Sequence, residues 1–227
     1  MGALIVGAGA GLSASLARLF VKNGLAVALA ARNPDKLAAL CAETGAVAHR
    51  CDATQPDDVV KLFDAVAAGQ GDPEIVVFNA SARAPGPIAE LDPAAVANAL
   101  AVSAFAGFLV AQQAAKRMLP HGAGTILLTG ASASVKGYVK SAAFAMGKFA
   151  LRGLAQSMAR ELAPQGIHVA HFVIDGGIRS ASRIDSANNP DSLLDPNDIA
   201  ESYWHVVQQK RTAWTWELEL RPWVERF

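Results

Sequence analysis

The 227-residue sequence predicts a doubly wound α/β fold, in which helices cover both faces of a mainly parallel seven-stranded sheet. Short apolar segments alternate with longer helical ones along the chain, and most of the short segments are apolar throughout. Such strands are buried on both faces, as parallel strands in α/β proteins are. No linker or change of composition divides the chain, so residues 1–227 are expected to form one domain.

Seven segments have the length and composition of strands. They are Ala3–Val6, Ala26–Ala30, Ala46–Cys51, Glu74–Phe78, Thr125–Thr129, His168–Ile174 and Trp214–Leu220. The last segment differs from the others because its apolar residues alternate with polar ones. We therefore expect Trp214–Leu220 to be an edge strand with one face in water.

Helix boundaries are marked by capping residues. The first helix carries an apolar stripe from Leu12 to Phe20 and ends before Gly24. Three later residues that favour the N-cap position each precede a proline: Asn33, Asp92 and Asp195. Each pair predicts an N-cap followed by proline at the first helical position. The stretch Ser180–Pro196 is polar and irregular, and is either a lid over a substrate or a loose connection.

Two helical segments, Ala94–Met118 and Ala142–Ala163, are apolar around much of their circumference. Helices of this kind usually need cover on a second side. Two explanations stand: alanine-rich helices that lie partly exposed, or a subunit interface built from both segments. We favour the interface, and with it a homodimer or homotetramer.

Composition excludes several classes of partner. The 20 basic and 20 acidic residues cancel, so no one-sided field would attract nucleic acid or an anionic membrane. Cys41 and Cys51 are too few for a disulfide framework, and no metal-ligand spacing surrounds them. The N-terminus lacks the pattern of a secretory signal, and no apolar run was expected to reach membrane-spanning length. We expect a cytoplasmic protein that binds a small molecule and no metal.

A glycine-rich segment joins the first predicted strand to the first predicted helix. It contains Gly7, Gly9 and Gly11 and is followed by Leu12. In this position glycines let backbone amides and the helix N-terminus approach a pyrophosphate. The segment therefore predicts a Rossmann-like dinucleotide site rather than a bare tight turn.

The spacing of Gly7 and Gly11 resembles the turn of the short-chain dehydrogenase/reductase family, although Ser13 stands where that family usually has another glycine. Similarities in the same order extend over nearly the whole chain. The resemblance implies that the residues binding the cofactor also include Asp52 beside the adenine ring, Asn79 and Ala80 after the fourth strand, Ile178 at the nicotinamide amide and Ser180. Asn79 is alternatively a turn residue that satisfies its own backbone.

Arg32 follows the second strand, where the choice between the two nicotinamide cofactors is made. An acidic side chain there binds the ribose diol, whereas a cation pairs with a 2′-phosphate. The segment Ala31-Arg32-Asn33 contains no carboxylate. We therefore expect NADP(H) in preference to NAD(H), unless Arg32 is an ordinary solvated residue at a strand end.

The resemblance also implies an altered catalytic site. In the family a tyrosine precedes a lysine by four residues, and here Phe144 precedes Lys148. Lys148 would hold the cofactor ribose, unless it is a surface lysine lying along an apolar face. A phenyl ring has no exchangeable proton and cannot serve as general acid or base. A gap-free alignment places Ala131 at the family's serine position and Ser103 at its asparagine position.

Other hydroxyls near these positions are candidate replacements. Ser132 and Ser134 reach the site if their loop bulges, although serines after strands are common turn and cap residues. Tyr138 is the nearest phenol in the sequence, but lacks the required spacing to Lys148. His171 lies within a predicted buried strand and is expected to be a hydrogen-bonded core residue.

These features imply an NADP(H)-dependent oxidoreductase with a non-standard or water-borne proton source. A positioned general acid is worth roughly 10²–10⁴-fold in rate, so its loss weakens ordinary ketone–alcohol chemistry. Reduction of an activated double bond or an iminium-like carbon therefore fits better than the reaction of a simple alcohol dehydrogenase. The expected substrate is a small carbonyl, enone or imine-like compound. Two alternatives stand beside this interpretation: a catalytically degenerate nucleotide-binding sensor or inactive subunit, and a lyase or isomerase without net hydride transfer.

Overall fold

A computed structural model describes residues 1–225, and its seven-stranded sheet is parallel throughout. The strand order is β3-β2-β1-β4-β5-β6-β7. The strands are β1 (Gly2–Val6), β2 (Ala26–Ala31), β3 (Val47–Arg50), β4 (Ile75–Phe78), β5 (Gly124–Thr129), β6 (Ile167–Ile174) and β7 (Glu217–Leu220). The predicted fold class is confirmed. The order reverses between β1 and β4, and ligands of open α/β sheets bind at the carboxyl ends of strands beside such a reversal.

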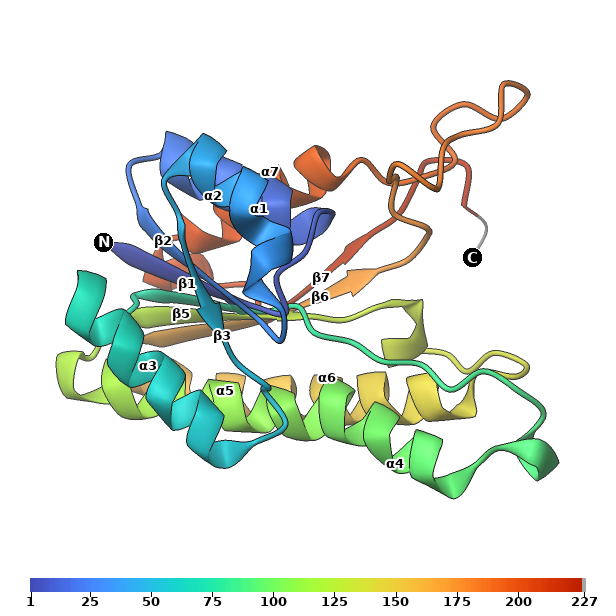
Figure 1. Ribbon diagram of the computed structural model, residues 1–227, viewed down its shortest axis with the longest axis horizontal. Coiled ribbons are helices and arrows are strands. Elements are labelled where there is room, and N and C mark those ends of the chain that lie inside the picture. The colour runs from blue at the N-terminus through green and yellow to red at the C-terminus, as the bar shows by residue number, and fades with distance from the viewer. Residues whose placement is uncertain (226–227) are drawn as a thin grey trace.

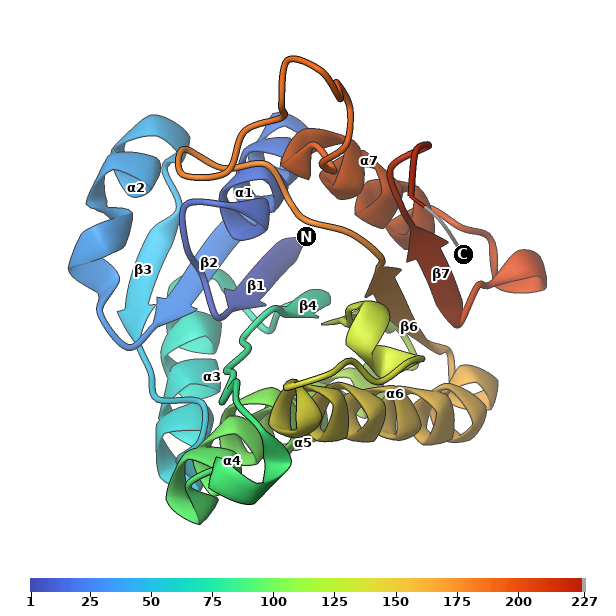
Figure 2. The same cartoon turned by 90° about the vertical axis from the view of Figure 1, so that its right-hand side faces the viewer.

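Helices cover both faces of the sheet (Figures 1 and 2). One face carries α1 (Leu12–Lys22), α2 (Ala38–Thr44) and α7 (Pro196–Val207). The other carries α3 (Pro56–Gln70), α4 (Pro93–Leu100), α5 (Ala106–Met118) and α6 (Ala142–Leu162). Side chains of β1 alternate between two hydrophobic cores, with Leu4 in one and Ile5 in the other. This alternation is the pleat of a strand buried on both faces.

The predicted caps are present. Asn33 accepts a hydrogen bond from the Asp35 amide at the start of a short 3₁₀ turn. Asp92 and Asp195 cap α4 and α7 in the same way, each ahead of a proline in the first turn. Gly24 follows α1 with φ of +82°, a left-handed conformation that favours glycine.

The longest helical stretch is Pro93–His121, in which five π-helical residues, Ala101–Phe105, join α4 to α5. By length and composition this stretch could cross a membrane, contrary to the expectation that no apolar run is long enough. Only 39% of its most apolar window is buried. Val110 and Ala114 pack on the sheet, whereas the ring of Phe108 is exposed. Core helices of soluble proteins satisfy the same criterion.

The last strand is shorter than predicted. Strand β7 begins at Glu217 and lies at the sheet edge, as expected. The residues before it are held in a turn. The Trp214 indole donates to the Gln209 carbonyl, and the Thr215 amide donates to the Gln209 side chain. The Thr215 amide, which a strand would pair with its neighbour, is satisfied by this side chain instead, so residues 214–216 lie outside β7 although their polar and apolar residues alternate.

The segment between β6 and α7 projects from the body of the protein (orange in Figure 1). It contains the predicted irregular stretch Ser180–Pro196. The Arg179 guanidinium crosslinks it through hydrogen-bonded ion pairs with Asp185 and Asp195, at 2.8 and 2.9 Å. Two carboxylates around one guanidinium hold this segment in a defined conformation.

Candidate active site

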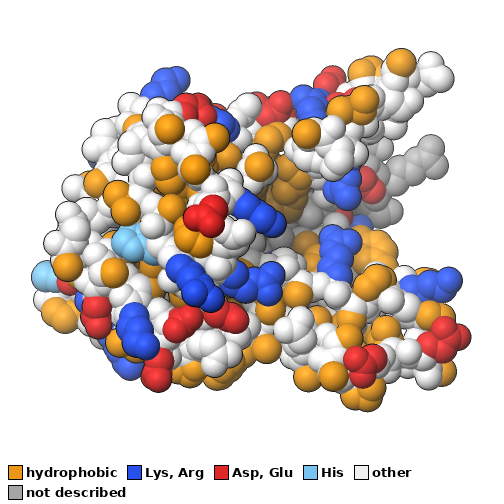
Figure 3. All heavy atoms as spheres, viewed as in Figure 1, with side chains coloured by type: hydrophobic (Ala, Val, Ile, Leu, Met, Phe, Trp, Pro, Cys, Tyr) orange, Lys and Arg blue, Asp and Glu red, His pale blue; other side chains and the backbone are white. Residues whose placement is uncertain are grey.

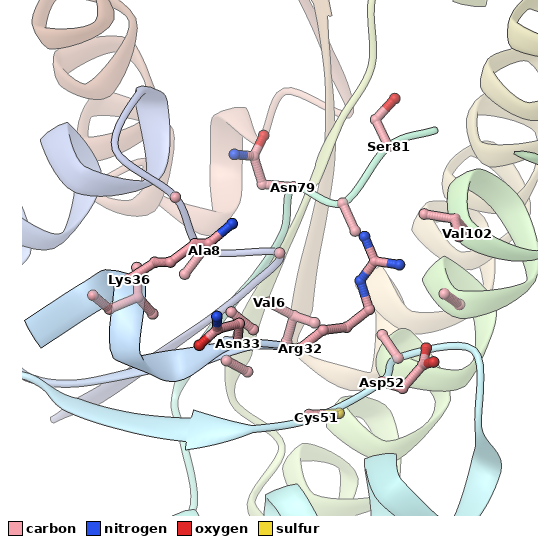
Figure 4. Close-up of a pocket in the computed structure, with 18 of the residues that line it drawn as sticks. Val6, Ala8, Arg32, Asn33, Lys36, Cys51, Asp52, Asn79, Ser81 and Val102 are labelled. Atoms are coloured by element: carbon pink, nitrogen blue, oxygen red, sulfur yellow. The ribbon is translucent and has the colours of Figure 1, made fainter. Parts of the chain in front are cut away.

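A cleft of about 530 Å³ opens at the carboxyl ends of β1, β2 and β4. The space-filling view shows a hollow between the two layers of helices, with Lys and Arg side chains near its rim (Figure 3). The close-up shows the cleft walls coming from the glycine-rich turn, the end of β2, the end of β3 and the loop after β4 (Figure 4). Its lining includes Gly7, Ala8, Gly9, Arg32, Lys36, Asp52, Asn79 and Ala80.

The glycine-rich turn is shaped by a close approach between β1 and the loop after β4. Gly7 has φ of +83°, and a Cβ atom there would lie 2.4 Å from the Ala80 amide nitrogen. Gly7 and Ala8 both donate to the Ala30 carbonyl, which holds the turn against β2. A Cβ at Gly9 or at Gly11 would meet nothing within 4 Å. The backbone is therefore open to a ligand on that side.

The N-terminus of α1 follows directly on Gly9 and Ala10, which line the same cleft. Gly11 caps α1 without a side-chain hydrogen bond, and no acidic residue occupies the first turn. The amides of this turn and the helix dipole favour a bound anion. Leu12 begins the helix, and its side chain is buried in the hydrophobic core beneath the turn.

Ser13 occupies the place of the family's third glycine and joins two walls of the cleft. Its Oγ donates to the Gly7 carbonyl at 3.3 Å and accepts from Asn79 Nδ2 at 2.7 Å. Asn79 is thus held by a side chain from α1 rather than by its own backbone. The serine adds a crosslink between the glycine-rich turn and the loop after β4, and it leaves the backbone of the turn open.

Two cations line the end of the cleft near β2. Arg32 and Lys36 are both exposed, and neither forms an ion pair among the described residues. Figure 4 shows the Arg32 side chain extending across the cleft and Lys36 lying on the side of Ala8. Asp52 is engaged locally, because its carboxylate accepts from the Thr54 amide and hydroxyl. These hydrogen bonds, and more weakly the charge of Arg32, lower the pKa of Asp52.

Lys148 is buried against the end of β5, with a 3% exposed fraction. Its Nζ donates to the Thr129 carbonyl at 2.8 Å. The Thr129 hydroxyl in turn lies 2.9 Å from the Tyr203 hydroxyl. Burial, with a smaller effect from the charge of Arg83, lowers the pKa of Lys148 to about 8. The interpretation of Lys148 as a surface lysine is therefore wrong.

The serines of the expected catalytic set make internal hydrogen bonds. Ser134 is fully buried, and its Oγ accepts from the Ala131 amide. Ser132 Oγ lies 3.5 Å from the Ile174 carbonyl, to which it donates. Ser103 is also fully buried, and its Oγ accepts from the Ala82 amide and donates to the Ala82 carbonyl. In this structure the three hydroxyls cap and anchor loops.

Tyr138 and His171 lie in different surroundings. Tyr138 is 48% exposed, and its ring lies 5.9 Å from the Nζ of Lys136. His171 is a core residue, as predicted, with Nδ1 3.0 Å from a Glu217 oxygen. Arg152 holds the same carboxylate through both of its oxygens. Burial lowers the pKa of His171 to about 4, so the imidazole is neutral near pH 7.

Comparison with known proteins places this arrangement in a family. The profile of the short chain dehydrogenases matches residues 2–190. This chain belongs to the short-chain dehydrogenase family. A short-chain dehydrogenase structure from Rhodopseudomonas palustris is 36% identical, with a TM-score of 0.86 over 98% of each chain. A metagenomic short-chain oxidoreductase in complex with NADP is 27% identical, with a TM-score of 0.84 over 98% of this chain and 97% of that one.

Curated relatives are similar over part of their length. The "Short chain aldehyde dehydrogenase 1" of Euphorbia lathyris is 31% identical over 178 residues, which cover 74% of this chain and 60% of that protein. The D-threitol dehydrogenase of Mycolicibacterium smegmatis is 31% identical over 172 residues, which cover 74% of this chain and 66% of that protein. The matched region thus spans about two thirds of these relatives or less.

Six of the eleven expected cofactor residues line the one cleft: Gly7, Gly9, Arg32, Asp52, Asn79 and Ala80. The other five, Gly11, Leu12, Lys148, Ile178 and Ser180, do not line it. Ile178 and Ser180 lie on the projecting segment, where Ile178 forms a bridge with Leu194 and Ser180 pairs with Arg183. Lys36 was missed by the sequence analysis. The one feature of the sequence that could have indicated Lys36 is its position one helical turn after the N-cap Asn33. Within residues 1–225, no group of three or more His, Cys, Asp or Glu side chains could hold a metal ion.

Replacing Lys148 tests the burial of its charge. We expect Lys148→Met to raise the midpoint of thermal unfolding at pH 7 by several degrees, because one kcal/mol corresponds to roughly 2–4 °C in a domain of this size. The pKa of Lys148 is about 8 in the folded protein, whereas that of an unperturbed lysine is 10.5. Wild type therefore gains stability as the pH rises from about 8 to 10.5, and the difference between the two proteins shrinks over that range.

Differential scanning fluorimetry across this pH range measures the difference. Lys61→Met, at an exposed position on α3, is the matched control and should show no such trend. A Lys148→Met protein less stable than wild type at every pH would contradict the expectation.

Proposed function

We propose that this protein is an NADP(H)-dependent oxidoreductase acting on a small carbonyl, enone or imine-like substrate, with a proton source other than tyrosine. The observation that carries the proposal is the cleft itself. It combines an open glycine turn, the uncapped N-terminus of α1 and two unpaired cations, Arg32 and Lys36. The glycine turn and the helix N-terminus suit a pyrophosphate. The two cations suit a 2′-phosphate.

The cofactor, when bound, supplies a hydride donor or acceptor. The residues of the chain have separate roles around it. The turn from Gly7 to Gly11 binds the pyrophosphate through its amides, and Arg32 with Lys36 binds the 2′-phosphate. Lys148 binds the ribose and adds positive potential near the reacting carbon. Phe144 excludes water from one side of the site but holds no proton. Ile178 and Ser180 remain proposed contacts to the nicotinamide.

A solved relative and the cysteines of this chain both fit this proposal. The metagenomic relative was crystallised with NADP, which supports a nicotinamide cofactor here. Both cysteines are free, and burial, with the nearby Asp58 and Asp52 charges, raises the pKa of Cys51 to about 12. A thiol with that pKa is not a nucleophile at neutral pH. Free thiols also fit the reducing interior of the cytoplasm.

A second candidate function is a nucleotide-binding sensor or inactive subunit. The internal hydrogen bonds of Ser103 and Ser134 favour it, because those hydroxyls are committed to loops. It predicts cofactor binding without turnover of any substrate. Steady NADPH consumption by the isolated protein would exclude it.

A fluorescence titration with NADPH and NADH tests the cofactor assignment. We expect NADPH to bind tighter by at least about tenfold. Arg32→Ala should weaken NADPH binding by roughly 10–100-fold, the range of one charge-assisted contact, and leave NADH binding within about threefold. The control is Arg160→Ala, which removes an exposed arginine from the far end of α6. If wild type binds neither nucleotide, the fold assignment stands and the oxidoreductase proposal fails.

Restoring the phenol tests the missing acid. We expect Phe144→Tyr to accelerate NADPH-dependent carbonyl reduction by about 10²-fold or more, because Lys148 lies one turn away on the same helix. Phe149→Tyr is the matched control, since Phe149 is exposed on α6. An unchanged rate with unchanged cofactor affinity would show that the substrate pocket, rather than the acid, has diverged.

We also infer that α5 and α6 form a subunit interface between copies of this chain. The outer faces of these helices and of the π-helical turn before α5 expose large apolar side chains: Phe105 (48%), Phe108 (40%), Met146 (51%) and Phe149 (45%). The rings of Phe105 and Phe108 stack with centroids 6.2 Å apart. Exposed large apolar side chains on neighbouring helices are typical of an interface.

Sedimentation velocity tests the interface. Wild type should sediment as a homodimer or homotetramer, and Phe149→Asp should give monomers because a charge would be buried without a partner. Lys61→Asp on α3 is the control and should keep the wild-type assembly. A monomeric wild type would show that α5 and α6 are simply partly exposed helices.

A further inference from the structure

Arg83 lies where the altered catalytic site differs most from the family pattern. Its guanidinium stacks on the ring of Phe144, with Cζ 4.1 Å from the ring centroid. The Nζ of Lys148 lies 6.0 Å from the same centroid. Two cations therefore flank the ring that replaces the catalytic tyrosine. No motif in the sequence distinguishes Arg83, which is one cation in a loop of mixed composition.

The positive charge of Arg83 is not neutralised by the protein. Among residues 1–225, its guanidinium takes part in no ion pair and no side-chain hydrogen bond, in contrast to Arg18, Arg117, Arg152 and Arg179. The residue is exposed, so its donors face solvent. Its charge also opposes the charge on Lys148, as the lowered pKa of that lysine reflects. An anion bound here would be attracted by both groups.

The backbone around Arg83 is anchored on both sides. Ala82 is held through its amide and carbonyl by the buried hydroxyl of Ser103. Ala84 is buried in a small cluster with Ala99 of α4 and Ala143 of α6. A binding group on a loop fixed in this way loses little conformational freedom when a ligand arrives. Ser103 is thus a positioning residue for Arg83, in place of the catalytic role that its alignment implied.

The chemistry of the pair favours a planar anion. A guanidinium stacked on an aromatic ring keeps its edge free, and that edge matches the two oxygens of a carboxylate. The phosphate-binding groups of the cofactor cleft are a separate set, since Arg83 does not line that cleft. An arginine stacked on a surface ring is also common in proteins without ligands. The rigid anchoring and the second cation at the same ring distinguish this one.

We propose that Arg83 binds the carboxylate of the substrate, so that the substrate is a carbonyl compound carrying a carboxylate, such as an oxo acid. This inference rests on the proposed function, because it places the reacting carbonyl beside Phe144 and Lys148. It narrows the substrate from small carbonyl compounds in general to anionic ones. It also assigns a binding role to a residue outside the family's catalytic set.

Calorimetric titration with phenylglyoxylate and with its uncharged methyl ester tests the proposal. The protein is studied free and loaded with NADP⁺, which cannot reduce a ketone. We expect wild type to bind the acid tighter than the ester. Arg83→Gln should weaken binding of the acid by roughly 10–100-fold and leave the ester within about twofold. Arg83→Lys should fall between, because an ammonium cannot form the bidentate contact.

Two further variants separate recognition from folding. Arg160→Gln removes a positive charge from the exposed side of α6 and should leave both affinities unchanged. Ser103→Ala frees the loop and should weaken binding of the acid several-fold. In the double variant with Arg83→Gln it should add nothing, because both changes act on one contact.

The outcomes are distinguishable. Equal affinity for acid and ester, or an acid affinity unchanged by Arg83→Gln, would overturn the proposal. So would a loss of NADP⁺ binding in Arg83→Gln with the acid-to-ester ratio preserved, since the guanidinium would then contact the cofactor. If no variant binds NADP⁺, the proposed function fails, and the titration of the free protein decides the role of Arg83 alone.

Discussion

Lys148 brings a positive charge into the protein interior, and the proposed catalytic site lies around it. Within residues 1–225 its ammonium forms no ion pair with a carboxylate, and it donates a hydrogen bond to the Thr129 carbonyl at the end of β5. A buried charge without a partner lowers the stability of the folded protein, unless a bound ligand interacts with it favourably. The neutral imidazole of His171 limits that cost, because a second buried cation nearby would add to the repulsion. Lys148 thus destabilises the ligand-free protein, and we expect its charge to become favourable when a ligand occupies the site.

The fold could be predicted almost completely, and the reason is physical. Parallel strands buried on both faces leave long apolar segments, and caps such as Asn33 and Asp92 mark helix starts locally. The error at Trp214–Trp216 arose because alternation describes a half-exposed turn as well as an edge strand. Hydrogen bonds to Gln209, a residue in a separate segment, decided between them.

The site could be predicted less well. The glycine turn and Lys148 were found because their neighbours in sequence identify them. Ser13, Ser103 and Arg83 act through residues far away in the chain: Ser13 through Asn79, Ser103 through Ala82, and Arg83 through Phe144. Spacing within one segment carries no information about such pairs. The sequence therefore predicts the positions at which this chain differs from the family pattern, while the structure shows what the side chains at those positions contact.

The contact between Ser103 and Gly147 has an evolutionary consequence. A Cβ atom on Gly147 would lie 2.8 Å from the Cβ of Ser103, so α6 and the π-helical turn are already as close as they can be. A lineage could regain the family's tyrosine at position 144 by a single substitution. Regaining asparagine at position 103 would require a larger side chain in a filled space and would release the loop that bears Arg83. The two substitutions are therefore unequal, because tyrosine at position 144 leaves this packing intact and asparagine at position 103 disturbs it.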